Sequence, residues 1–465
     1  MGKKSVRAKE TRYEYAGSDL DKWFDEVPLK FPGRDAIWSL ATADDGKLYI
    51  GLAGEHNRGT AALAAYDPKK GGARIVCDLG ELLGDPRTIG RAPHSKIHFA
   101  ICPVKRHIWF ATHVSGAMGR DDIYGPIGRG PTADTMTGYE GGRLLRYDTK
   151  TGQTEQFGVI VPAEGARCLH VSPDARYGYG ISYPKHRFFM RDLKTGETYI
   201  SGRIGRYGGI DLFVDRRGRP WGAHDGYEGT EPGQFYYFDQ ASRRLVDVEA
   251  YLPRSSRRRM SFPRFGSHVL HMTETPDGQA MVSSYGESRI ALFDPKSLTV
   301  YDWGPVWDKP PVQKLIPRSE VDRWHEQHKH ERRRRRHRHH HDHGPRPHFA
   351  WCPVFDTAGR TIDGKRYDRL VWYGEECWEY QEDVRLCAIA YNHNRPGEIV
   401  KIRFGTPTAG GYRAGHWAAS ARGLDGRIYF TDRVRDPHNT DGHRYKALRL
   451  AVLTPPEDLG PLRKV

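Results

Sequence analysis

The sequence predicts an all-β protein, and more closely a seven-bladed β-propeller of four-stranded antiparallel blades. Glycine (52) and proline (30) are abundant among the 465 residues, and 11% of the residues are aromatic. This composition is typical of strands and tight turns, and unlike that of a helical bundle or a disordered chain. Two kinds of hairpin also recur along the chain, and such internal repeats indicate a propeller. Seven units fit the length.

The first repeat is a turn in which an aspartate ends a short apolar or aromatic strand. Aspartate followed by Pro, Lys or Gly favours a tight turn. Four instances have an aromatic residue before the aspartate and one has an arginine: Tyr66-Asp67, Tyr147-Asp148, Phe238-Asp239, Phe293-Asp294 and Arg191-Asp192. These turns predict one hairpin in each unit.

The second repeat is an apolar strand, a polar turn and another apolar strand. Its instances cover residues 37–52, 98–113, 168–183, 210–224 and 269–285, with two weaker ones at 348–375 and 416–432. Two hairpins give four antiparallel strands, which is one blade. We therefore expect a single propeller domain over residues 1–465. Residues 1–35 would close the ring against the last blade, and residues 305–347 would form an Arg/His-rich insert between blades five and six.

One rim of this propeller is expected to carry the function. If strands A to D are counted from the channel outward, the start of A and the end of B share a rim, because neighbouring strands are antiparallel. The B–C loops and the D–A connections lie on the same rim. The long loops fall there, at residues 114–141, 226–234, 305–347, 374–386 and 433–443. Long loops on one face of a rigid scaffold are typical of functional sites.

The chain is basic, with a formal net charge of +15. Without the six arginines at 332–336 and 338 the net charge is still +9, which favours an anionic partner. The basic run at 325–343 has no interleaved aromatic side chains, so nucleic acid is a disfavoured partner, and a solvated loop is its plainer interpretation. No apolar run approaches the roughly 18 residues of a membrane span, so we expect no membrane partner. The basic N-terminus is not followed by the apolar stretch of a secretory signal, and the compartment stays open.

Histidine and tyrosine gather at the expected rim. His98 starts strand A of blade two and His113 ends strand B of the same blade, so the hairpin brings them within cross-strand reach. Tyr183 ends strand B of blade three, and Arg203 ends strand D of that blade, with Arg206 close behind. Imidazoles and a phenol suit acid–base chemistry, and an arginine fork suits a carboxylate. The alternative is a wet, inert channel with solvated loop charges.

Several segments carry a resemblance to a known family. HFAICP and FATH in blade two, followed by SYP, KTG and GRIG in blade three, resemble the seven-bladed propeller polysaccharide lyases, over residues 35–300. That family includes the ulvan lyases and relatives that cleave rhamnose–glucuronate linkages. The resemblance implies β-elimination at a uronic acid, with an anionic uronate-containing glycan as the partner.

The resemblance also implies roles for individual residues. The implied catalytic residues are His98, His113, Tyr183 and Arg203. Arg203 would neutralise the uronate carboxylate, and which of the other three is the base or the acid stays open. Four further residues of the rim are predicted to bind the substrate: Arg206, His224, Tyr227 and Tyr285.

A structural zinc near the channel is a further implication of the resemblance. The predicted ligands are His271, Cys352 and His416, which start strand A in blades five, six and seven, and His and Cys are ordinary zinc ligands. A histidine from 337–348 would be the fourth. The alternative for Cys352 is a buried core thiol. The elimination itself needs no cofactor.

Two other classes of function stay open. One is a propeller that binds an anionic glycan or a protein partner without catalysis, although the chain lacks WD repeats. The other is a propeller glycoside hydrolase or lactonase. A metal-dependent lactonase would need an acidic cluster at the channel, and a sialidase would need an arginine triad and Asp-box repeats. The rim is instead dominated by His and Tyr, so the sequence predicts a carbon–oxygen lyase that acts on a uronate glycan.

Overall fold

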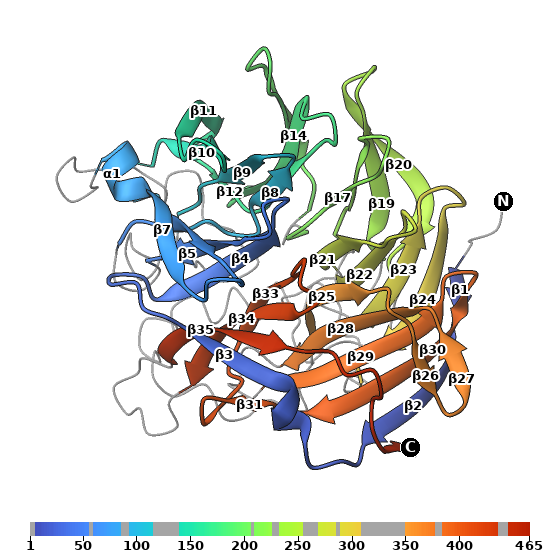
Figure 1. Cartoon of the computed structure of the whole chain (residues 1–465). Helices are drawn as coiled ribbons and strands as arrows, with labels where there is room; N and C mark the ends of the chain where they lie inside the picture. The colour runs from blue at the N-terminus through green and yellow to red at the C-terminus, as the bar shows by residue number, and fades with distance from the viewer. Residues whose placement is uncertain are drawn as a thin grey trace, which may run out of the picture.

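Seven small, mostly antiparallel sheets stand in a ring, which confirms the predicted β-propeller (Figure 1). The computed structural model describes residues 5–54, 59–84, 93–114, 139–205, 209–225, 232–253, 268–284, 289–307, 349–376, 384–435 and 445–465. Helix is confined, in these residues, to α1 (Leu79–Leu83) and the 3-10 turn η1 (Leu20–Trp23). Neither is long or apolar enough to cross a membrane.

Each blade has four strands, ordered from the innermost outward. Blades one to three are β4 (Ala36–Thr42), β5 (Leu48–Ala53), β6 (Ala62–Tyr66) and β7 (Ala73–Asp78); β8 (Ile101–Val104), β9 (His107–Ala111), β10 (Gly141–Asp148) and β11 (Thr154–Pro162); and β13 (His170–Val171), β14 (Tyr177–Tyr183), β15 (Arg187–Asp192) and β16 (Thr198–Arg203). Blades four and five are β17 (Phe213–Val214), β18 (Pro220–Ala223), β19 (Gln234–Asp239) and β20 (Arg244–Tyr251); and β21 (Val269–Glu274), β22 (Ala280–Ser284), β23 (Arg289–Asp294) and β24 (Thr299–Pro305). Blades six and seven are β25 (Phe349–Asp356), β28 (Arg369–Glu376), β29 (Arg385–Asn392) and β30 (Arg395–Gly405); and β33 (Trp417–Arg422), β34 (Ile428–Arg435), β35 (Tyr445–Leu453) and β3 (Phe24–Leu29).

The small ribbons β26 (Arg360–Ile362) with β27 (Lys365–Tyr367), and β31 (Thr408–Ala409) with β32 (Tyr412–Arg413), lie outside the blade sheets. A further short strand, β12 (Gly165–Ala166), pairs with the end of β14.

The N-terminal segment is shared among three blades. β3 pairs antiparallel with β35 and so forms the outer strand of blade seven. Before it, β1 (Ser5–Arg7) and β2 (Lys9–Tyr15) add parallel strands to the outer edges of blades five and six, and β36 (Leu462–Lys464) pairs with β2. Figure 1 shows the blue strands β2 and β3 beside the orange and red strands of the last blades. The two chain ends therefore tie blades five to seven together.

The aspartate turns join the third and fourth strands of a blade, as the repeat predicts. Asp148 accepts a hydrogen bond at Oδ1 from the backbone N–H of Lys150 (2.9 Å), and Asp192 does the same for Lys194 (2.9 Å). The carboxylate thereby satisfies the backbone of its own turn. This local chemistry explains why the same residues recur at the outer hairpin of blade after blade.

Aromatic pairs fill the space between neighbouring blades. The rings of Phe235 and Phe293 stack at 4.2 Å between blades four and five, and those of Tyr49 and Tyr147 lie 5.9 Å apart between blades one and two. Such contacts cover the facing sides of neighbouring sheets, which fits strands that read as nearly continuous apolar runs. The rigid ring that results fixes the positions of side chains at its rim.

Candidate functional site

The rim of blades two and three brings together three of the predicted catalytic residues. His98 lies just before β8, His113 lies just after β9, and Tyr183 is the last residue of β14. The ring centroids of His98 and His113 are 5.6 Å apart, and those of His113 and Tyr183 are 5.2 Å apart. Two imidazoles and a phenol thus form one series of ring contacts, as the strand ends predict.

The register of blade two adds a cation that sequence reasoning missed. Lys96 lies directly opposite His113, because the backbone N–H of Lys96 donates to His113 (3.1 Å) and that of His113 donates back (2.7 Å). His98 is two residues further along. Glycine is required beside this pair, since a Cβ at Gly165 would lie 2.1 Å from Nδ1 of His113. The close approach of β12 therefore seats the His113 ring.

Burial and positive neighbours keep His98 neutral. Its side chain is only 6% exposed, and burial, followed by the charges of Lys96, His113 and Arg167, lowers its pKa well below the usual range. Nδ1 lies 3.1 Å from the carbonyl oxygen of Arg167. A carbonyl only accepts, so Nδ1 carries the proton and Nε2 carries the lone pair.

Tyr183 is the more accessible member of the series. It is partly exposed, whereas His98 and His113 are buried. Burial of its hydroxyl raises the pKa of Tyr183, although the nearby charge of Arg167 acts in the opposite direction. The guanidinium of Arg167 lies 5.3 Å from the centre of the Tyr183 ring. The phenol is therefore protonated at neutral pH and stands beside a cation.

Two cations, Lys96 and Arg433, lie against Trp38 in the same region. The indole ring stacks on His98 at 5.1 Å with an interplanar angle of 12°. Nζ of Lys96 is 3.7 Å from the centre of that ring, and the guanidinium of Arg433 is 4.5 Å from it. Cations thus lie next to the proton-transfer groups, which suits an anionic ligand.

Arg203 occupies an outer position. It is the last residue of β16, its side chain is exposed, and Nε donates to the carbonyl of Gly205 (2.8 Å). Its positive charge contributes, after burial and Arg167, to the lowered pKa of His186, whose ring centroid lies 5.5 Å from that of Tyr183. The structure therefore places Arg167, not Arg203, against the Tyr183 ring. The only sequence signal for Arg167 is its place one residue before the inner hairpin of blade three.

The predicted substrate-binding residues are mostly beyond the described part of the chain. Arg206, Tyr227 and Tyr285 lie outside the described residues. His224 follows β18 and is held between the carbonyl of Ile204 (2.9 Å) and the carboxylate of Asp247 (2.8 Å) on the outer strand. These contacts orient its ring toward the outer strands of blade four. The 305–347 insert falls almost entirely outside the described residues as well.

The predicted zinc ligands are held apart by an aromatic ring. Trp351 lies 5.5 Å from His271 and 5.3 Å from His416 between ring centroids. Nδ1 of His416 contacts the carboxylate of Glu376 (2.5 Å), and Sγ of Cys352 donates to the carbonyl of Trp417 (3.0 Å). His416 and Cys352 thus have other partners, and the expected set does not form a group of neighbouring donor atoms in the described part of the chain.

Another set of potential metal ligands is assembled instead. Within the residues that the structure describes, one group of three has all its donor atoms within 4.8 Å of one another: Cys168, His170 and Asp211. Both Cys168 and His170 lie in the predicted inner hairpin of blade three, and Asp211 lies in that of blade four. The sequence does not show which side chains of neighbouring blades face each other, so this group was missed.

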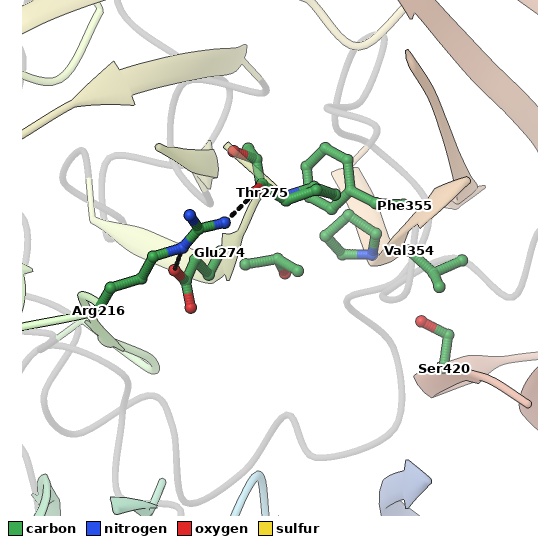
Figure 2. A pocket seen from close by; sticks show the side chains of 9 residues that line it. Arg216, Glu274, Thr275, Val354, Phe355 and Ser420 are labelled. Carbon is green, nitrogen blue, oxygen red and sulfur yellow. Dashed lines mark hydrogen bonds and ion pairs between the residues drawn. The ribbon is translucent and has the colours of Figure 1, made fainter. Parts of the chain in front are cut away.

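Five rings at the inner strands form a continuous circuit of contacts. Consecutive centroids are 5.0 to 6.3 Å apart in the circuit of Trp38, Phe99, His271, Trp351 and His416. At the opposite ends of the inner strands, a pocket of about 470 Å³ opens between blades four to seven. Figure 2 shows Arg216 against Glu274 on one side of it and Val354, Phe355 and Ser420 on the other. The rim site and this pocket are thus on opposite sides of the ring circuit.

Acid should destabilise the protein through its buried imidazoles. The pKa values of His98 and His186 lie well below their usual range, because of burial first and then positive neighbours: Lys96, Arg167, Arg203, His113 and His268. A neutral folded imidazole takes up a proton on unfolding, so stability falls as the pH drops below about 6.5. Two such imidazoles lower the free energy of unfolding by up to about 2.7 kcal/mol for each pH unit of acidification.

Urea unfolding midpoints between pH 7 and pH 5 test this expectation. The variant His186→Gln lacks one of the two imidazoles, so its free energy of unfolding should depend less on pH, by up to about 1.4 kcal/mol per pH unit. An unchanged pH dependence in that variant would contradict the buried, neutral state of His186.

Comparisons with known proteins give only distant structural similarities. No family model matches the chain, and no curated protein sequence matches it. Among solved structures, a catalytically inactive virginiamycin B lyase from Staphylococcus aureus with quinupristin is 9% identical, with a TM-score of 0.47 over 93% of this chain and 99% of that chain. The β-propeller domain of Cps50 (Swd1) from Myceliophteria thermophila is 9% identical, with a TM-score of 0.46 over 91% and 98%. TolB from Acinetobacter baumannii is 10% identical, with a TM-score of 0.33 over 60% and 56%. At such identities no residue role carries over to this chain.

Proposed function

We propose that this chain is a polysaccharide or oligosaccharide lyase that cleaves a uronic-acid-containing glycan by β-elimination. The observation that carries the proposal is the contact series of His98, His113 and Tyr183 beside Arg167. It combines proton-transfer groups with a cation that can bind a carboxylate. The resemblance of the rim segments to propeller polysaccharide lyases supports the same reaction.

The reaction sets three requirements for the rim. A base removes the proton at C5 of the uronate, the electron pair forms the C4–C5 double bond, and the C4–O4 bond breaks while O4 takes up a proton. The C5 proton is acidic enough only when the charge of the adjacent carboxylate is neutralised. Stabilising the enolate-like intermediate is therefore the largest contribution, and proton transfer adds about 10²- to 10⁴-fold.

The chemistry of the individual side chains suits separate roles. Arg167 binds the carboxylate, since its guanidinium adjoins Tyr183 and a planar fork of donors matches two carboxylate oxygens. Tyr183 protonates O4, because its phenol carries a proton at neutral pH and is the accessible member of the series. The base is on the histidine side, where His98 is neutral and offers the lone pair of Nε2.

Arg203 has a supporting role in this proposal. Its exposed side chain lies on the outer strand, and its charge reaches the rim at His186. It adds to the positive field that attracts a polyanion rather than clamping the carboxylate. The resemblance implies that Arg203 neutralises the carboxylate, and this proposal gives that role to Arg167 instead.

Ultraviolet absorbance during incubation with uronate glycans tests the proposal. The panel consists of ulvan, gum arabic, and pectic and glycosaminoglycan fragments. β-Elimination leaves a conjugated 4,5-unsaturated uronate, which absorbs, so the absorbance should rise with at least one glycan. New reducing ends without absorbance would indicate a hydrolase and contradict the proposal. Binding without any cleavage would favour a non-catalytic propeller.

A further inference from the structure

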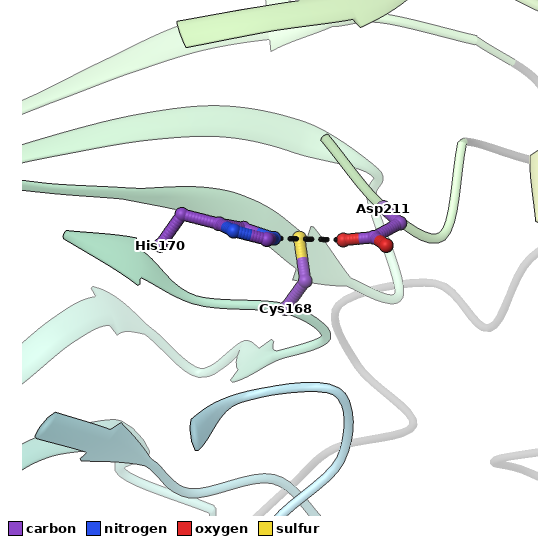
Figure 3. Close-up of side chains that lie close together, drawn as sticks. All are labelled: Cys168, His170 and Asp211. Atoms are coloured by element: carbon purple, nitrogen blue, oxygen red, sulfur yellow. Dashed lines mark hydrogen bonds and ion pairs between the residues drawn. The ribbon is translucent and has the colours of Figure 1, made fainter. Parts of the chain in front are cut away.

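The strongest unassigned feature is the group formed by Cys168, His170 and Asp211. Cys168 and His170 are two residues apart on an extended segment of blade three, so their side chains share a face. Asp211 precedes β17 in blade four. Nε2 of His170 lies 2.8 Å from Oδ1 of Asp211, and Figure 3 shows Sγ of Cys168 beside that contact. The three donor atoms thus converge from two blades.

The carboxylate is oriented by the backbone of two blades. Oδ1 of Asp211 accepts from the N–H of Leu212 (2.9 Å) in blade four, and Oδ2 accepts from the N–H of Met272 (3.2 Å) in blade five. Asp211 is only 8% exposed and Cys168 is fully buried, while the imidazole of His170 is 29% exposed. The group is therefore fixed on one side and accessible from the His170 side.

We propose that Cys168, His170 and Asp211 bind a zinc ion, with the fourth position open to a water molecule. One sulfur, one imidazole nitrogen and one carboxylate oxygen are all ordinary zinc donors, and three protein ligands with an open position are a recurring arrangement. A hydrogen bond between His170 and Asp211 needs only these two side chains, so it does not explain why the Cys168 thiol lies at the same place. Binding converts the Cys168 thiol to a thiolate and releases one proton to the solvent.

A second observation comes from the neighbouring strand β21. His271 is 6% exposed, and its Nε2 has no hydrogen-bond partner in the part of the chain that the structure describes. The charge of Asp211 reaches this imidazole. Thr273, two residues along on the same face of β21, lines the pocket of Figure 2. A buried imidazole without a hydrogen-bond partner in the described residues thus lies within the electrostatic influence of Asp211, and a pocket begins two residues further along the same strand.

Cobalt absorption of the full-length chain tests the site. The protein is treated with a chelator, dialysed, and titrated with Co²⁺, which reports a thiolate ligand through a sulfur-to-cobalt charge-transfer band in the near ultraviolet. We expect this band to saturate at one equivalent and to disappear when Zn²⁺ is added. The Arg/His-rich run at 325–343 can bind cobalt only through nitrogen and oxygen, so it gives no such band.

Cys168→Ser should abolish the charge-transfer band. Cys102→Ser is the matched control, because Cys102 lies against the same segment, with Sγ accepting from the N–H of Val171 (3.2 Å), but is not one of the three donors. This control should keep the band. No thiolate band in the unmodified chain, or a band that survives Cys168→Ser, would overturn the proposal.

The variant His170→Gln tests the same metal site if Cys168→Ser does not fold. His170 is partly exposed, so its replacement leaves the buried thiol and the core in place. Loss of one ligand should weaken cobalt binding at least tenfold, and unchanged binding would refute the assignment. None of these measurements uses a glycan, so their outcome is independent of the proposed lyase activity.

Discussion

Replacing Tyr183 with phenylalanine should lower kcat of glycan cleavage by about 10²- to 10⁴-fold, the range of general acid catalysis. The change removes only the hydroxyl, so the contact of the ring with His113 and its place beside Arg167 remain. KM should change little, because proton donation to O4 occurs in the transition state and not on substrate binding. Initial rates from the ultraviolet assay give both constants.

Tyr177→Phe is the matched control for this variant. Tyr177 begins the same strand, β14, so it lies at the opposite end from Tyr183. Removal of its hydroxyl should leave kcat and KM unchanged. A Tyr183→Phe enzyme that turns over at the rate of the unmodified chain would contradict the role of the phenol. A rise in KM with an unchanged kcat would instead indicate a binding role.

Replacing Arg167 with alanine should lower kcat/KM by about 10²- to 10³-fold, as expected when a charge-stabilising donor is lost. The same change at Arg203 should cost less than about tenfold, since an exposed charge acts through the solvent and is screened by salt. The reason for the difference is position. The guanidinium of Arg167 lies against the Tyr183 ring, while Arg203 donates to Gly205 at the outer strand.

A methyl-esterified substrate separates charge neutralisation from other effects of the Arg167 change. The ester carries no negative charge, so the ratio of rates between the unmodified chain and Arg167→Ala should shrink on that substrate. An equal ratio on the acid and the ester would argue against a carboxylate clamp. A larger loss from Arg203→Ala than from Arg167→Ala would return the clamp to Arg203, where the sequence resemblance places it.

The fold was predictable because its signals are local. The outer hairpins of blades one to five repeat an aspartate, and its carboxylate accepts a hydrogen bond from its own turn, as Asp148 and Asp192 do. The contact of His98 with His113 was also predictable, since an antiparallel hairpin brings the start of one strand and the end of the next to one rim. Neither inference needs the angle between blades. Tyr183 was predicted to share that rim, but its contact with His113 joins two blades.

The parts that depend on contacts between blades were not predictable. Lys96 and Arg167 are isolated cations in extended segments, and only the three-dimensional register shows that they face the rim. The zinc prediction placed strand starts on one rim but could not show that Trp351 lies between His271 and His416. The parallel pairing of β1 and β2 with outer strands has no periodic signal in the sequence either.

The proposed lyase breaks a glycosidic linkage without the addition of water. Mass spectrometry of both products from one defined uronate oligosaccharide distinguishes this reaction from hydrolysis. We expect the two product masses to add up to the mass of the substrate, because elimination forms a double bond in the uronate and adds no water. A combined product mass that exceeds the substrate by one water molecule would show hydrolysis and rule out a lyase.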